Sequence, residues 1–216
     1  MIRAIFIVVG AALAIVPQQA SADKLAIKQQ SWISTGRGNS LESDPDLFTF
    51  ANGAVTTQSE STNIHTHYSK KSLTRLKNYV FSGEMYIADE DGGIGVTFHS
   101  DYPNSDTYYR LRRFGGDGNF HIAPHPDGEQ KMTSGNTDMG LGPQAERWYG
   151  FKVMVRTTRK ATRVRARAWR SDVKEPKVWL IDCSDSSSIH IKRGRLGLWS
   201  AGPGLKSWRK LKVVVQ

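Results

Sequence analysis

Residues 92–123 constrain the fold more than any other part of the chain. They read GGIGVTFHSDYPNSDTYYRLRRFGGDGNFHIA and contain three short runs in which apolar and polar residues alternate. Loops rich in Gly, Asp, Asn and Pro separate these runs. Alternation with a period of two places successive side chains on opposite faces of a β-strand. Closely spaced strands of this kind indicate an antiparallel meander with one face toward a core.

The same strand signals recur along the rest of the chain, whereas helix signals are scarce. Outside the meander we expect strands near Trp32 and over residues 47–50, 54–58, 63–68, 79–88, 148–157, 163–169, 177–182, 195–200 and 208–215. Residues 124–143 lack periodicity, which is typical of a long loop. Residues 23–216 therefore predict a single all-β domain, a two-sheet antiparallel jelly-roll sandwich.

The first 22 residues have the pattern of a secretory signal peptide. They carry one positive charge at Arg3, an apolar run over residues 4–16 and the small-residue ending Ala20-Ser21-Ala22. The apolar run is too short to span a bilayer. We expect cleavage after Ala22, a secreted or periplasmic protein, and no transmembrane segment after cleavage.

The charge and the cysteine content limit the kinds of partner and the kind of core that the sequence predicts. The formal net charge is +10, and Cys183 is the only cysteine. A single cysteine forms no intramolecular disulfide, so we interpret Cys183 as a small buried residue of a core that stabilises the fold unaided. Positive charge outside the cytoplasm favours an anionic partner such as an acidic polysaccharide, the cell envelope or a membrane surface. Export disfavours nucleic acid, and no helix-turn-helix or zinc-finger spacing occurs. The sequence does not indicate an oligomeric state.

The polar faces of the meander carry the candidate ligand-binding residues. If the apolar side chains face the core, the opposite faces share Thr97, His99, Tyr108, Arg110, Arg112 and His121. Aromatic rings pack against the C–H faces of sugars, and arginine pairs a carboxylate or sulfate with two hydrogen bonds. This surface predicts a platform for a uronate or sulfate group, although an ordinary solvated sheet face also alternates.

Several segments add a resemblance to a known superfamily. They read GIGVTFHSDYPNSDTYYRLRRF, GNFHIAPH, WYGFKVMV, VWLIDCSD and GRLGLWSAGPGLKSW. Together, from about Trp32 to Val215, they resemble secreted bacterial domains of the concanavalin A-like lectin/glucanase (LamG-like) superfamily. The resemblance implies two curved antiparallel sheets, a glycan-binding groove on the concave sheet and, in many members, a structural calcium. Where an acidic calcium ligand would stand, this chain has basic Arg209 and Lys210, so we expect no cofactor.

A polysaccharide lyase acting on an acidic glycan is the main alternative to a glycan-binding protein. β-Elimination needs a group that neutralises the sugar carboxylate, a base for the C5 proton and an acid for the leaving oxygen. Jelly-roll lyases are similar in using Arg or Gln, His and Tyr, although the RSELR and YFKAG runs are absent here. The base would be His99 or His121 and the acid Tyr108. Arg110 or Arg112 would neutralise the carboxylate and lower the pKa of the tyrosine.

The remaining polar patterns give weaker indications of function. A glycoside hydrolase of this fold would need E-x-D-x-x-E spacing, which Glu84 and residues 89–91 lack; Glu84 is predicted to pair with an arginine across the sheet. His65 and His67 would share a strand face, as metal ligands sometimes do, but no third ligand is evident. A further pattern is a comb of arginines made up of Arg163, Arg165 and Arg167. We interpret it either as an anionic contact or as a charged edge that blocks aggregation. A third reading is a structural envelope protein that adheres through its basic surface.

Overall fold

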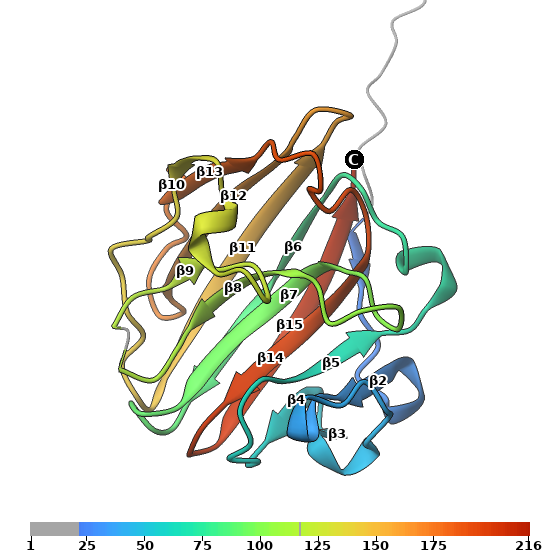
Figure 1. Ribbon diagram of the computed structural model, residues 1–216. Helices are drawn as coiled ribbons and strands as arrows, with labels where there is room; N and C mark the ends of the chain where they lie inside the picture. Colours follow the sequence, from blue (N-terminus) through green and yellow to red (C-terminus); the bar gives the residue numbers. More distant parts are fainter. Residues whose placement is uncertain (1–21, 117) are drawn as a thin grey trace, which may run out of the picture.

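The computed structural model describes residues 22–116 and 118–216, which form two antiparallel β-sheets packed face to face (Figure 1). The nine-stranded sheet has the order β10-β13-β12-β11-β6-β15-β4-β3, with β1 paired to β15, and the six-stranded sheet has the order β2-β5-β14-β7-β8-β9. This confirms the predicted two-sheet antiparallel jelly roll. The predicted signal peptide lies outside the described residues, apart from Ala22. No helix among the described residues is long and apolar enough to cross a membrane.

The strands of the nine-stranded sheet are β1 (Ala22–Lys24), β3 (Thr49–Ala51), β4 (Ala54–Thr57), β6 (Tyr79–Ile87), β10 (Ser134–Asn136), β11 (Arg147–Thr157), β12 (Thr162–Arg170), β13 (Ile181–Asp185) and β15 (Lys206–Val215). Those of the six-stranded sheet are β2 (Trp32–Thr35), β5 (Ile64–Tyr68), β7 (Gly93–Ser100), β8 (Tyr109–Arg113), β9 (His121–Ile122) and β14 (Arg195–Ala201). The described connections include the short 3-10 helices η1 (Gln29–Ser31), η2 (Arg37–Asn39), η3 (Pro45–Leu47), η4 (Lys71–Leu73) and η5 (Glu129–Lys131).

The apolar core lies between the two sheets and follows the alternation of the sequence. Ile94 and Val96 of β7 and Leu111 of β8 are buried there. Trp208 of β15 is also fully buried, and its indole N–H donates a hydrogen bond to the Gly95 carbonyl of the opposite sheet (3.1 Å). Burial of apolar surface is the main stabilising contribution. It therefore determines which residues of β7 and β8 point away from the core.

His99 departs from this alternation, and its predicted place on the outer face is wrong. Between Thr97 and Ser100, β7 has one residue more than the facing segment of β14. His99 has a left-handed backbone there, with φ 52°, and such a β-bulge redirects the side chain. The His99 ring therefore lies in the core, where its nitrogens are 3.0 Å from the Tyr79 hydroxyl and 2.9 Å from the Thr157 hydroxyl.

Two boundaries also differ from expectation. The predicted loop at 124–143 contains η5 and β10, which pairs with β13. The strand predicted over 177–182 instead begins at Ile181 and runs to Asp185. Cys183 lies within β13 and is buried, as predicted. Burial, aided by the adjacent Asp182, raises the pKa of its thiol to about 12, so little reactive thiolate forms near neutral pH.

Candidate functional site

The outer face of the six-stranded sheet brings together five of the six predicted site residues. Thr97 of β7 pairs with Arg110 of β8, and Arg112 pairs with His121 of β9. Cross-strand partners project from the same face. Tyr108 immediately precedes β8 and continues the alternation of Arg110 and Arg112. The meander therefore assembles these residues on one face, as the sequence predicts, with His99 as the exception.

This face is covered along part of its length. Thr97 and Tyr108 are fully buried, as is Trp199 of β14. Tyr108 and Trp199 belong to a small apolar cluster separate from the main core. The Arg110 guanidinium lies over both rings, with Cζ 5.8 Å and 4.9 Å from the respective centroids. Arg110 and Arg112 are partly exposed, whereas the Tyr108 ring is fully buried.

Asn63 holds this cluster through its side-chain amide. Its Oδ1 accepts hydrogen bonds from the Tyr108 hydroxyl (2.7 Å), the Trp199 indole N–H (2.9 Å) and Arg110 (3.2 Å). Its Nδ2 donates to the Asp106 carboxylate (3.2 Å). Asn63 has φ 56°, a left-handed conformation that asparagine adopts more readily than most residues. One side chain therefore ties the segments before β5 and β8 to β14.

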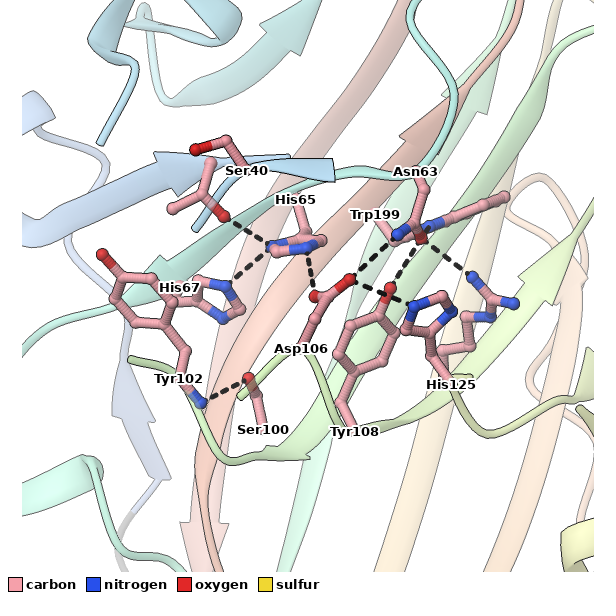
Figure 2. A network of polar contacts seen from close by, with 12 residues as sticks. Ser40, Asn63, His65, His67, Ser100, Tyr102, Asp106, Tyr108, His125 and Trp199 are labelled. Atoms are coloured by element: carbon pink, nitrogen blue, oxygen red, sulfur yellow. Dashed lines mark hydrogen bonds and ion pairs between the residues drawn. The ribbon is translucent and has the colours of Figure 1, made fainter. Parts of the chain in front are cut away.

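A chain of ionisable side chains runs beside Asn63, as Figure 2 shows. Nδ1 of His65 lies 2.7 Å from Nε2 of His67, and Nε2 of His65 lies 2.8 Å from the Asp106 carboxylate. The same carboxylate lies 3.1 Å from Nε2 of His125. Tyr102 stacks on His67 with ring centroids 4.4 Å apart. The segment 102–106 thus covers the two histidines of β5. The Asp106 and His125 side chains, 25% and 24% exposed, form the accessible end.

Burial and neighbouring charges set the protonation of this chain. Burial, reinforced by His65 and Arg195, lowers the pKa of His67 well below its usual range. Burial alone would raise the pKa of Asp106, but hydrogen bonds from His125 and His65 hold that pKa below its usual value. His67 is therefore neutral and Asp106 ionised near neutral pH.

The two histidines predicted as lyase bases lie in different environments. Burial lowers the pKa of His99 to about 3, and its ring faces the core. His99 is therefore neither a base for an external substrate nor a ligand-binding residue. His121 is on the outer face, where its Nδ1 lies 3.1 Å from Glu129.

Tyr108 is in contact with two other histidines. Its ring centroid lies 5.3 Å from that of His65 and 5.1 Å from that of His125, which stacks on it. Burial raises the pKa of Tyr108 and outweighs the opposing influence of Arg110. A nearby arginine does lower this pKa, as predicted, but its effect is smaller than that of burial. The phenol therefore stays protonated at neutral pH, and its hydroxyl donates a hydrogen bond to Asn63.

His65 and His67 share a strand face, as predicted, but the His65 nitrogens already face His67 and Asp106. Across residues 22–116 and 118–216, no group of three or more His, Cys, Asp or Glu side chains is arranged to hold a metal ion.

Sequence reasoning missed four residues of this network: Asn63, Asp106, His125 and Trp199. Asp106 had a usable signal, because it stands two residues before Tyr108 and extends the alternation that places Arg110 and Arg112 on one face. Asn63 and His125 had none, since each is a single polar residue beside a strand and reaches the cluster only in the folded chain.

Replacement of Asn63 tests whether its amide holds the network. In Asn63→Ala, the Tyr108, Trp199 and Arg110 donors lose their shared acceptor. We expect the free energy of unfolding, measured in urea, to fall by about 1–3 kcal/mol. Asn52→Ala is the matched control, because Asn52 is exposed and has a similar left-handed φ of 50°. Equal losses of unfolding free energy in Asn63→Ala and Asn52→Ala would show that the effect comes from the left-handed backbone. That result would contradict a role of the Asn63 amide in holding the network.

The arginine comb lies on the other sheet and is paired with acids. Arg163 and Arg165 contact Asp182 at 2.6 and 3.0 Å. Arg167 forms an ion pair with Glu175. The interpretation of the comb as a sheet edge is wrong, because β12 lies between β11 and β13.

The two antiparallel sheets and their strand order define a concanavalin A-like jelly roll. Solved structures with this fold include the carbohydrate binding module CBM66 from Bacillus subtilis, with a TM-score of 0.57, 10% identity and coverage of 85% of this chain and 95% of that one. A prokaryotic β-1,3-1,4-glucanase (lichenase) from a mouse hindgut metagenome has a TM-score of 0.55 and 9% identity, with 92% and 99% covered. A galectin-like protein of unknown function from Bacillus subtilis has a TM-score of 0.54 and 10% identity, with 86% and 90% covered.

At such identities the likeness establishes the fold, which agrees with the resemblance in the sequence. No family model matches the chain, and no curated protein matches it.

Proposed function

We propose that this protein is a secreted or periplasmic glycan-binding protein that recognises an acidic polysaccharide on the outer face of its six-stranded sheet, taken as the concave face. The observation that carries the proposal is the pair of partly exposed arginines on β8, Arg110 and Arg112. Arg110 is fixed by hydrogen bonds to the Ala123 carbonyl (2.9 Å) and to Asn63. A guanidinium held in place loses little further freedom when it binds a carboxylate or sulfate.

The remaining predicted residues have supporting roles in this proposal. His121 of β9 pairs with Arg112, but it is buried beside Glu129 and therefore supports the arginines from within the sheet face. Tyr108 and Thr97 lie beneath the arginines as buried support. The net charge of +10 favours an anionic ligand. Neighbours in fold include a carbohydrate binding module and a lichenase, which is consistent with a saccharide ligand.

Incubation with matched acidic and neutral polysaccharides tests the proposal. Columns of immobilised alginate, polygalacturonate, heparin and neutral β-glucan would be loaded at low salt and eluted with a salt gradient. We expect retention on at least one acidic polymer and none on the neutral glucan, because arginine pairing requires an anionic group. Equal retention on the neutral polymer, or none on any acidic one, would contradict an acidic glycan ligand.

A lyase is the second candidate, favoured by the convergence of Tyr108, His125, Asn63 and Arg110. In this version His125 replaces His99 as the base, and Tyr108 is the acid. Because Tyr108 is fully buried, the segment 123–128 would have to move before the phenol could reach a leaving oxygen. Ultraviolet absorbance after incubation with the same polymers distinguishes a lyase from a binding protein, because β-elimination creates an unsaturated product and binding does not.

A further inference from the structure

The outer face of the nine-stranded sheet contains a hollow that the proposed function does not use. It has a volume of about 500 Å³ and is lined by residues of β6, β11, β12, β15 and the connection after β12. An adjoining hollow of about 330 Å³ shares Met154 and Trp179 with it. The two hollows therefore form one trough across neighbouring strands. Its dimensions are those of small-ligand sites.

Two partly exposed tryptophans line this trough, and the structure fixes the position of each. Trp169 of β12 lies against Gly150 of β11, so closely that a Cβ on Gly150 would be 2.5 Å from the indole ring. Trp179 packs against the Arg167 guanidinium, whose Cζ is 4.4 Å from the ring centroid. Arg167 in turn donates to the Lys177 carbonyl (2.9 Å) and pairs with Glu175. Indole rings held in this way are suited to stack on sugar rings.

The charges of the trough are unequal. Its two carboxylates are each shared by two cations: Glu84 lies 2.7 Å from both Arg209 and Lys210, which confirms the predicted arginine pairing. Glu175 pairs with Lys152 (2.5 Å) as well as with Arg167. The cationic residues that line the two hollows are Lys152, Lys210, Lys212, Arg156, Arg163 and Arg165. Arg163 and Arg165 share a third carboxylate, that of Asp182. The six cations still outnumber these three side-chain carboxylates, so positive charge exceeds negative charge along the trough.

We infer that this trough is a second saccharide-binding site, separate from the six-stranded face, and that its ligand is an anionic oligosaccharide. The indoles of Trp169 and Trp179 stack on sugar rings, while the basic end near Arg163 and Arg165 binds a carboxylate or sulfate. The excess of cations makes the trough complementary to an acidic chain rather than to a neutral one. Two sites on opposite sheets allow one protein to contact two chains or two parts of one polymer.

Titration calorimetry with soluble oligosaccharides tests this site. Alginate hexasaccharide supplies carboxylates and heparin hexasaccharide supplies sulfates, so the two titrations identify the anionic group. Trp179→Ala should weaken the trough's binding about tenfold. Trp148→Ala is the matched control, because Trp148 is a partly exposed residue of the same sheet that does not line either hollow. It should change binding by less than about twofold.

Arg112→Ala separates this inference from the proposed function. If both are right, the wild type binds two oligosaccharides per chain, and Arg112→Ala and Trp179→Ala each weaken a different one. Loss of binding in Arg112→Ala alone, with Trp179→Ala unchanged, would overturn the trough and leave the six-stranded face intact. Loss in Trp179→Ala alone would support the trough and contradict the proposed function. Equal losses in Trp179→Ala and Trp148→Ala would also overturn the trough.

Discussion

At about pH 4.5 the free energy of unfolding is expected to be lower than at pH 7 by about 3 kcal/mol or more. The main cause is His99, whose pKa burial lowers to about 3. Below a pH of about 6.5 the unfolded chain takes up a proton on this histidine, while the folded chain does not. The unfolded state then binds more protons, so stability falls as the pH falls. About two pH units at about 1.4 kcal/mol each give roughly 2.7 kcal/mol.

His67 adds to the same acid sensitivity, because its pKa is also lowered by burial. Urea denaturation at both pH values of the wild type and of His99→Gln measures the His99 contribution. We expect the variant to lose about 2 to 3 kcal/mol less on acidification than the wild type. His190→Gln is the control, since His190 contacts backbone carbonyls such as that of Ser187 (2.7 Å). The same acid loss in His99→Gln as in the wild type would show that His99 is not buried in its neutral form.

Removal of both β8 arginines is expected to weaken binding to the retained acidic polymer by about 100-fold. Each charge-assisted hydrogen-bonded pair contributes about 1.5–3 kcal/mol, and about 1.4 kcal/mol corresponds to a factor of ten. Arg110→Ala/Arg112→Ala therefore loses two such contacts at the site. Because Arg110 also bonds Asn63 and Ala123, the single variant Arg112→Ala, with an expected loss of about tenfold, is measured beside the double variant. Circular dichroism of both variants shows whether they fold.

The matched control for charge is Arg37→Ala/Arg170→Ala, which removes two exposed arginines that pair with Asp44 and Asp172. It changes the net charge by the same amount as the β8 double variant. Equal weakening in the two double variants, measured by salt elution from the same polymer, would favour a basic surface that adheres without a site. That outcome would support the structural envelope reading.

The fold was predictable because it depends on a periodic signal. The alternation around Val96 and Leu111 determines which side chains enter the core, and the paired register of β7, β8 and β9 then follows. The inward position of the His99 ring could not be predicted in this way. The bulge beside it is set by one unpaired residue opposite β14, and a period-two pattern does not reveal where a strand gains an extra residue.

The candidate site was predictable only in part. Arg110 and Arg112 could be placed on one face from the alternation of β8. The burial of Tyr108 could not, because the side chains that surround it include Asn63 and His125, which are distant from each other in sequence. Contacts of this kind depend on how connections fold back over the sheet, which carries no periodic signal.

Chemical-shift mapping tests the central claim most directly. A ¹⁵N-labelled sample would be titrated with a soluble oligosaccharide of the acidic polymer that retains the protein, and both backbone and arginine side-chain resonances would be followed. The account predicts that shifts concentrate at Arg110, Arg112 and His121 and along β8 and β9, with saturation at increasing ligand. Binding that leaves the resonances of β8 and β9 unmoved would contradict a glycan site on the six-stranded sheet.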